Sequence, residues 1–264
     1  MSDKTLITAH SGSDGTPDNS LACVRYALST DADAFEVDVR RLADGTLALG
    51  HDAADHTAPT LREVLALAAA KPGVRINCDL KERGLEPAVA ALAAECGMAG
   101  RLIFSGSVDV NIFAAHPELH DCAEVYLNIE EYVPDLYLNY RNIPDFELTA
   151  AEIITKVCRE HGIATVNMNQ VLITRRFIET LKDSGIALSA WTVTRRFSST
   201  GSSRKASATS RRADLHAHSV CATGRQNAIA ERTFSSDGVF FRNRPAFCRS
   251  AHGRCRPDRR SWGR

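Results

Sequence analysis

The sequence predicts an α/β fold, a TIM (β/α)8 barrel that is incomplete or distorted at its C-terminal end. Three observations lead to this prediction. Over residues 1–194, short apolar runs typical of buried strands alternate with helical patterns. One such barrel uses about 250 residues, and the chain has 264. After residue 194 the alternation stops and the composition changes abruptly, so the end of the barrel is the part that departs from the pattern.

Seven segments are expected to form the parallel strands of this barrel. In the second of them, apolar and polar residues alternate with a period of two, so Glu36 and Asp38 share one face of the strand. A turn then leads into a short hairpin strand at 46–51. The seven expected strands are 4–10, 34–40, 74–81, 101–105, 122–127, 164–168 and 186–193.

Helical patterns separate most of these strands. Asp18 and Asn19 can cap the first helix, and Thr60 can cap the second. Several helices are followed directly by glycine, which is typical of a helix end. The expected helices are 20–29, 60–70, 86–96, 108–115, 149–161 and 174–184.

The formal net charge of zero conceals two chemically different segments. Residues 195–264 hold 16 Lys and Arg against 4 Asp and Glu, whereas the residues before them hold 16 against 28. Segment 195–234 is rich in Ser, Arg, Ala and Thr, with few large aliphatic residues, and is therefore expected to be mostly disordered or poorly packed. The run 236–245 has the form of a closing strand. We therefore predict a barrel core at 1–194, a disordered or frame-shifted segment at 195–234, and a candidate eighth strand with a basic tail at 235–264.

The overall composition is that of an ordinary globular protein, with 44% hydrophobic and 24% charged residues. No apolar stretch approaches the roughly 20 residues that a membrane helix needs, and the first strand begins too early for a signal peptide. We therefore expect a cytoplasmic protein. Its eight cysteines form no C-x-x-C pair, which favours reduced, structural thiols.

Carboxylates occur in pairs on two of the expected strands. Glu36 and Asp38 are two residues apart on one strand, and Asp79 and Lys81 repeat the spacing on the next. The carboxyl ends of barrel strands converge on one face, so we expect these side chains to meet there. Three carboxylates without nearby thiols favour a hard cation, Mg²⁺ or Ca²⁺, over zinc.

Two histidines lie at the ends of strands near this group. His10 ends the first strand and His51 ends the hairpin strand. One histidine can remove a proton from a nucleophile while the other protonates a leaving oxygen. Lys81 can place its positive charge against a phosphate oxygen. The set is therefore suited to metal-assisted cleavage of a phosphodiester.

At this point the sequence resembles a known family, the glycerophosphodiester phosphodiesterases. The resemblance covers about residues 5–193 and rests on several short motifs in the same order. These are A-H-S-G at 9–12, T-P-D-N-S at 16–20, E-V-D-V-R at 36–40, D-G-T at 44–46, H-D at 51–52, D-L-K at 79–81 and A-W-T-V at 190–193. The resemblance implies a TIM barrel that hydrolyses glycerophosphodiesters to glycerol 3-phosphate and an alcohol.

The resemblance also implies a role for each matching residue. Glu36, Asp38 and Asp79 would be the metal ligands, and the catalytic acid–base pair would be His10 and His51. The remaining matches would serve the substrate: Lys81 would contact phosphate or order the metal site, Asn19 would hold the loop after the first strand, and Trp191 would line the pocket.

Two departures from the family pattern leave alternatives open. Ser11 stands where the family has Arg, which removes a bidentate phosphate contact. Asp79 replaces a Glu, and an Asp here is similar to the phospholipase D-like enzymes that make cyclic phosphates. The alternatives are a catalytically disabled barrel, a cyclising phosphodiesterase and, through the basic tail, nucleic-acid binding.

Among partners, we expect a small phosphodiester substrate, no membrane span and no specific nucleic acid, because the tail carries no recognised binding motif. The oligomeric state stays open. The Arg/Ser-rich composition of 195–234 also fits out-of-frame translation of a GC-rich gene, with a functional basic tail as the alternative.

Overall fold

A computed structural model describes residues 5–133, 140–142, 144–182, 184–194, 217–222, 231–235 and 238–242. The chain divides into two compact units, Met1–Asn227 and Ala228–Arg264. The first unit contains the barrel. In the second, the described residues form an antiparallel pair of strands, β10 (Glu231–Ser235) and β11 (Gly238–Arg242).

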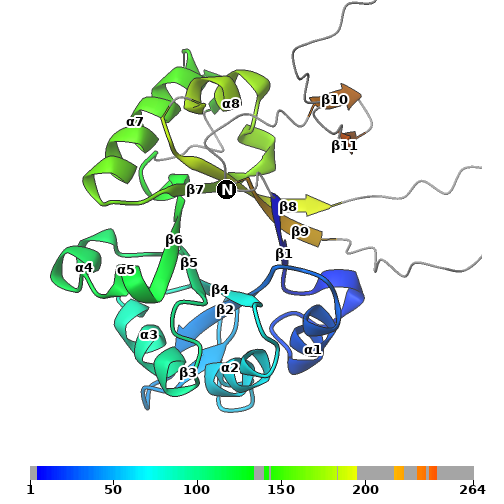
Figure 1. Ribbon diagram of the computed structural model, residues 1–264, viewed down its shortest axis with the longest axis vertical. Coiled ribbons are helices and arrows are strands. Elements are labelled where there is room, and N and C mark those ends of the chain that lie inside the picture. The colour runs from blue at the N-terminus through cyan, green and yellow to red at the C-terminus, as the bar shows by residue number, and fades with distance from the viewer. Residues whose placement is uncertain are drawn as a thin grey trace, which may run out of the picture. The chain divides into compact units, whose positions relative to one another are not determined.

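Seven parallel strands form most of the barrel wall, as the sequence predicts (Figure 1). Each pairs in parallel with the next, from β1 through β2 and β4 to β8. The hairpin strand β3 (Leu47–Leu49) pairs antiparallel with the end of β2, while β1 pairs with its beginning. The bounds are β1 Thr5–Ala9, β2 Ala34–Arg41, β4 Arg75–Leu80, β5 Leu102–Gly106, β6 Ala123–Asn128, β7 Thr165–Asn169 and β8 Ala187–Thr194.

Helices follow the strands and cover the outside of the sheet (Figure 1). The apolar outer face of the strands packs against them and forms the main hydrophobic core. In the described part of the chain, the α-helices are α1 Leu21–Ser29, α2 Leu61–Ala69, α3 Glu86–Glu95, α4 Val110–Ala115, α5 Leu119–Cys122, α7 Phe146–Glu160 and α8 Arg175–Leu181. The short 3-10 helices are η1 Ser13–Gly15, η2 Ile129–Glu131, η3 Tyr140–Asn142 and η4 Gln170–Leu172. The predicted fold class is therefore confirmed.

The first two helices begin at capping side chains. Thr60 caps α2 in a capping box with Glu63, as expected. The cap of α1 is Ser20, whose side chain accepts a hydrogen bond from the backbone of Cys23. The expectation that Asp18 or Asn19 caps this helix was therefore wrong. Asn19 has a left-handed backbone, and its amide instead points to a strand of the barrel.

A second, smaller apolar cluster combines Ala34, Ile103 and Tyr126 with Leu6. These residues come from four different strands. Because side chains two apart share a face, Ala34 faces the same side of β2 as Glu36. The interior of the barrel therefore holds a small apolar cluster on the side of the strand beginnings, below the polar residues at the carboxyl ends.

The closing strand of the barrel differs from the expectation. β9 (Ala217–Ala222) lies between β8 and β1 and is antiparallel to both. The predicted closing run 236–245 contributes β11, which pairs with β10 instead. Most of the segment 195–234, for which disorder is expected, lies outside the described residues, and that expectation stays a prediction. Within the segment, residues 217–222 form β9 and residues 231–234 belong to β10. The physical reason is that β1 and β8 would otherwise expose unpaired backbone groups, which a short extended segment can satisfy. The predicted domain boundaries stay a prediction.

The described residues contain no helix with the length and apolar content of a bilayer span. Five cysteines with described side chains are free thiols: Cys23, Cys78, Cys96, Cys122 and Cys158. Burial raises the pKa of the Cys158 thiol to about 12. The predicted reduced, structural character of these five thiols is consistent with this environment.

Candidate active site

Three carboxylates meet at the carboxyl ends of β2 and β4. Glu36, Asp38 and Asp79 can each offer one oxygen such that all three oxygens lie within 4.8 Å of one another. Asp38 and Asp79 are paired in register on the two neighbouring strands. Glu36 and Asp38 are each only 5% exposed. A compact group of buried negative charge therefore stands at the end of the barrel where the sequence predicts it.

Lys81 offsets part of this negative charge. Its ammonium nitrogen lies 2.8 Å from an oxygen of Asp38 and 3.1 Å from an oxygen of Asp79. Burial alone would lower the pKa of Lys81, but the two carboxylates outweigh that effect and raise it. The lysine is therefore cationic at neutral pH and holds the two strands' carboxylates in a fixed arrangement.

Asn19 fixes the orientation of Asp38 from the loop after β1. Its side-chain amide donates to Asp38 Oδ2 at 2.6 Å, and its carbonyl oxygen accepts the backbone N–H of Asp38 at 3.0 Å. Asn19 adopts a φ of 50°, which asparagine tolerates better than most residues. Burial raises the pKa of Asp38, but the hydrogen bonds from Asn19 and Lys81 outweigh it, so the pKa is lowered.

Glu36 is the most deeply placed carboxylate. The backbone N–H of Ser11 donates to its Oε2 at 2.8 Å. Burial, followed by repulsion from Asp38 and Asp79, raises its pKa well above the ordinary value. Ser11 also holds the loop, because its hydroxyl accepts the backbone N–H of Asn19 at 2.7 Å. Although it lacks the guanidinium that the family resemblance leads one to expect, Ser11 orders two members of the site.

Both histidines are held by their Nδ1 atoms. His10 Nδ1 lies 2.8 Å from the carbonyl oxygen of Ser11, which can only accept, so this nitrogen carries the hydrogen. His51 Nδ1 lies 2.7 Å from a carboxylate oxygen of Asp52, with the same consequence. In each neutral ring Nε2 is therefore the nitrogen that carries the lone pair.

Each histidine lies near the carboxylates, and His10 Nδ1 is 3.8 Å from Glu36 Oε2. The charge of His10 acts on Asp79, and that of His51 acts on Asp38, in each case as a smaller influence than burial. His51 is 68% exposed, and Arg40 secures its loop by donating two hydrogen bonds to its carbonyl oxygen, at 3.0 and 2.7 Å. The exposed ring is therefore positioned by its backbone, at the rim of the site.

One oxygen of this group is suited to a cation. Asp79 Oδ1 is buried, and no donor among the described residues reaches it. Burial raises the pKa of Asp79, with Lys81 opposing this effect. Gly106 lies against the same oxygen, so closely that a side-chain Cβ would overlap it. A buried carboxylate oxygen without a hydrogen bond is costly by itself and fits a metal ligand. The residues present therefore fit a divalent ion bound by oxygen atoms.

Sequence reasoning missed polar residues on the far wall of the barrel. Glu130 follows β6, and burial, with smaller contributions from Glu131 and Asp79, raises its pKa to about 7. Asn128 and Asn167 lie side by side on β6 and β7. The only sequence signal was their position near the ends of expected strands. Trp191 lies half-buried on β8, and its role as a pocket wall stays a prediction.

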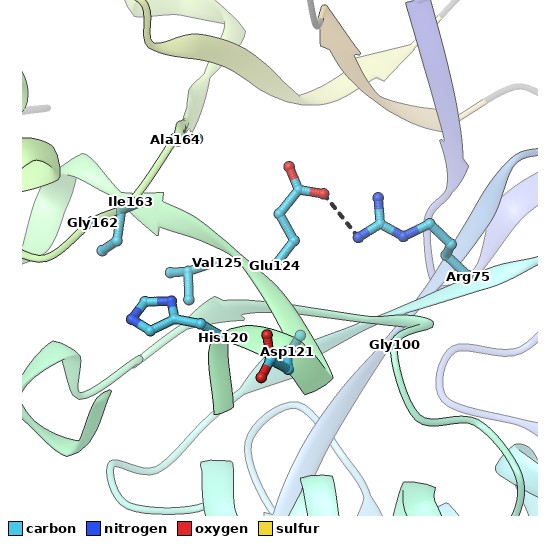
Figure 2. A pocket seen from close by; sticks show the side chains of 10 residues that line it. Arg75, Gly100, His120, Asp121, Glu124, Val125, Gly162, Ile163 and Ala164 are labelled. Carbon is cyan, nitrogen blue, oxygen red and sulfur yellow. Dashed lines mark ion pairs between the residues drawn. The ribbon is translucent and has the colours of Figure 1, made fainter. Parts of the chain in front are cut away.

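A cavity of about 530 Å³ lies at the other end of the barrel (Figure 2). It is bordered by Arg75 and Glu124, which stand at the beginnings of their strands and form an ion pair of 2.8 Å. Glu124 also accepts a hydrogen bond from the hydroxyl of Thr165 at 3.2 Å. None of the predicted site residues lines this cavity. Polar contacts at this end of a TIM barrel generally serve stability, so the carboxylate group remains the candidate active site.

No protein-family model and no curated protein matches the chain. Solved structures do match it. One is a glycerophosphodiester phosphodiesterase from Parabacteroides distasonis, with 16% identity and a TM-score of 0.50 over 71% of this chain and 85% of that one. Another, from Silicibacter pomeroyi, is assigned as a glycerophosphoryl diester phosphodiesterase and has 16% identity and a TM-score of 0.55 over 71% and 82%.

A third match is a phosphodiesterase from Oleispira antarctica in complex with the product sn-glycerol-3-phosphate. It has 19% identity and a TM-score of 0.52, over 71% of this chain and 84% of that one. At these identities the likeness shows the fold. The family that the motifs resemble is therefore also the family whose solved structures share this barrel.

Proposed function

We propose that the protein is a metal-dependent phosphodiesterase that hydrolyses glycerophosphodiesters or a similar small phosphodiester. The observation that carries the proposal is the group of three carboxylates around Lys81, flanked by two histidines at the carboxyl end of the barrel. The solved structures of similar fold support it, since one of them binds glycerol 3-phosphate. We extend the proposal to a cytoplasmic location, which cell fractionation would test.

Glu36, Asp38 and Asp79 would hold the ion, Mg²⁺ or Ca²⁺. When bound, such an ion supplies positive charge that neutralises a phosphodiester and polarises its phosphorus centre. Lys81 is already committed to two carboxylates, so its main task is to order the ligands and to limit their mutual repulsion. Its remaining hydrogen can reach a phosphate oxygen.

The histidines would divide the proton transfer. Each presents Nε2 as the reacting atom, because Nδ1 is engaged with Ser11 in one case and with Asp52 in the other. One Nε2 takes a proton from the attacking water, and the other gives a proton to the departing alcohol oxygen. The products would be a phosphomonoester and an alcohol.

The decisive experiment measures hydrolysis of glycerophosphocholine and of bis(p-nitrophenyl) phosphate with Mg²⁺, with Ca²⁺ and with EDTA. His10→Ala should lower kcat by about 10²- to 10⁴-fold, the usual contribution of a general acid or base. His116→Ala is the matched control, since this exposed histidine follows α4 and pairs only with Glu118 among the described residues. Absence of turnover by the folded, metal-loaded protein would exclude the proposal, and cyclic phosphate as the sole product would exclude hydrolysis.

A further inference from the structure

Two amides lie on the wall of the barrel across from the histidine loops. Asn128 and Asn167 are paired in register on β6 and β7. Asn167 is 6% exposed, and its side-chain nitrogen donates to Asn128 Oδ1 at 2.9 Å. Buried amides are costly unless their hydrogen-bonding groups are satisfied. We therefore ask whether each remaining oxygen and nitrogen of the two amides has a hydrogen-bond partner.

The backbone of Gly106 settles which atom of Asn128 is the oxygen. Its N–H can only donate, and it donates to Asn128 Oδ1 over a long 3.4 Å. The same oxygen accepts from Asn167 Nδ2, so the Asn167 amide is oriented as well. Asn167 Oδ1 is the atom left over. It is buried, and no donor among the described residues reaches it.

This leftover acceptor belongs to the same site as the carboxylates. Gly106 contacts Asn128 through its N–H, and its Cα lies against Asp79 Oδ1. One glycine therefore separates the asparagine pair from the carboxylate oxygen that fits a cation. On one side of this glycine lies Asp79 Oδ1, a charged acceptor, and on the other lies Asn167 Oδ1, a neutral one. Both are buried, and no donor among the described residues reaches either.

The two acceptors suit different parts of one ligand. A carboxylate is the preferred partner of a metal ion. A neutral amide oxygen is suited to a neutral donor, and a phosphate diester has no proton to offer it. An alcohol hydroxyl has one. In a glycerophosphodiester, the glycerol hydroxyls are neighbours of the phosphate in one small molecule. One substrate can therefore place its phosphate near the carboxylates and a hydroxyl near the amide.

We propose that Asn167 Oδ1 accepts a hydrogen bond from a glycerol hydroxyl of the substrate, with Asn128 as the residue that positions it. This proposal rests on the proposed function and adds the group that distinguishes a polyol diester from other diesters. A site built to bind a hydroxyl rejects analogues that lack it, because its buried acceptor then stays unpaired.

The test compares two diesters in one variant. Asn167→Leu keeps the size of the side chain and removes the acceptor. We expect kcat/KM for glycerophosphocholine to fall about tenfold, the effect of one hydrogen bond of about 1.4 kcal/mol, while that for bis(p-nitrophenyl) phosphate changes less than about twofold. An equal loss on both diesters, or no loss on either, would overturn the proposal. Ser105→Ala is the control, since its hydroxyl already donates to Asn77, and it should leave the ratio of the two diesters unchanged.

A binding measurement separates this proposal from the proposed function. Calorimetry in the presence of Ca²⁺ compares glycerol 3-phosphate with inorganic phosphate. The unaltered protein should prefer glycerol 3-phosphate, and Asn167→Leu should remove about tenfold of that preference. If the protein shows this preference and its loss in Asn167→Leu but hydrolyses no diester, the proposed phosphodiesterase activity is rejected and the hydroxyl site is retained. Turnover with no preference for glycerol 3-phosphate would reject the hydroxyl site alone.

Discussion

Replacing Glu36 by Gln should stabilise the metal-free protein and abolish its stabilisation by metal. Three buried carboxylates repel one another, and Lys81 offsets only part of their charge. The pKa of Glu36 is raised, so its contribution to stability is complete at low pH and is lost as the pH rises through the raised value. At pH 8 the unaltered protein therefore bears a cost that the glutamine variant avoids.

The spacing of the carboxylates gives the size of this cost. With an effective dielectric constant of about 20, two unit charges at the observed limit of 4.8 Å repel by about 3.5 kcal/mol. The nearby lysine reduces the net effect, and we expect a gain of about 2 kcal/mol. For a domain of this size that corresponds to a rise in Tm of about 4–8 °C. The side-chain oxygen of the introduced glutamine would still accept the N–H of Ser11.

Thermal unfolding in EDTA and then in Ca²⁺ or Mg²⁺ measures both effects. The unaltered protein should gain stability on adding the ion, by mass action, and Glu36→Gln should not. Glu152→Gln on the exposed face of α7 is the control for loss of one negative charge. Destabilisation of the metal-free protein by Glu36→Gln, or an unchanged response to the ion, would refute the reasoning.

Three further predictions concern the residues around this group. Gly106→Ala should destabilise the protein by more than about 1 kcal/mol and weaken its response to Ca²⁺, because the new Cβ overlaps Asp79 Oδ1 and the backbone has a φ of 77°; urea denaturation that matches the unaltered protein would contradict this. Asn19→Ala should weaken metal binding by calorimetry about 10-fold, since it frees Asp38, and Asn19→Gly, which accepts the positive φ, should show the same loss if the hydrogen bond is responsible. The pKa of Glu130 is raised from 4.5 to about 7. Its contribution to stability in EDTA should therefore be fully present below about pH 4.5 and be lost as the pH rises through about 7. In urea denaturation, Glu130→Gln should lose less stability than the unaltered protein between pH 5 and 8, and an identical loss would exclude this carboxyl as a source.

The parallel strands could be predicted because their sequence pattern is strong. The segment expected at 34–40 is observed as Ala34–Arg41, and its period of two places Glu36 and Asp38 on the same face. The helix expected at 60–70 is observed as Leu61–Ala69 with its Thr60 cap. Helix α5, by contrast, has only four residues and offers no period to recognise. β9 was missed because six residues in an Arg/Ser-rich surrounding carry too little apolar pattern, and only the open edges of the barrel explain their pairing.

The site was predictable where chemistry and position coincide in the sequence. Charged residues two apart at a strand end, such as Asp79 and Lys81, indicate a shared inward face. Asn128 and Asn167 also lie near strand ends, as Asp79 and Lys81 do. A neutral amide at a strand end, however, is common in proteins without any role in a site, so the sequence alone does not single these two out. Their pairing depends on the register between β6 and β7 and on the backbone of Gly106, which no sequence pattern reports.

The pairing of β9 with β1 has a consequence for how the chain folds. Residue 5 pairs with residue 222, and residue 9 with residue 218, so the barrel closes only through contacts between distant parts of the chain. Such non-local pairing is slow, because the entropy of closing a long loop is lost before the contacts form. During synthesis, the seven parallel strands are complete by residue 194, yet their two outer edges wait for the segment at 217–222. Until it emerges, each nascent barrel exposes two strand edges that another copy can pair with, and the yield of correctly folded protein depends on how quickly this closing strand arrives.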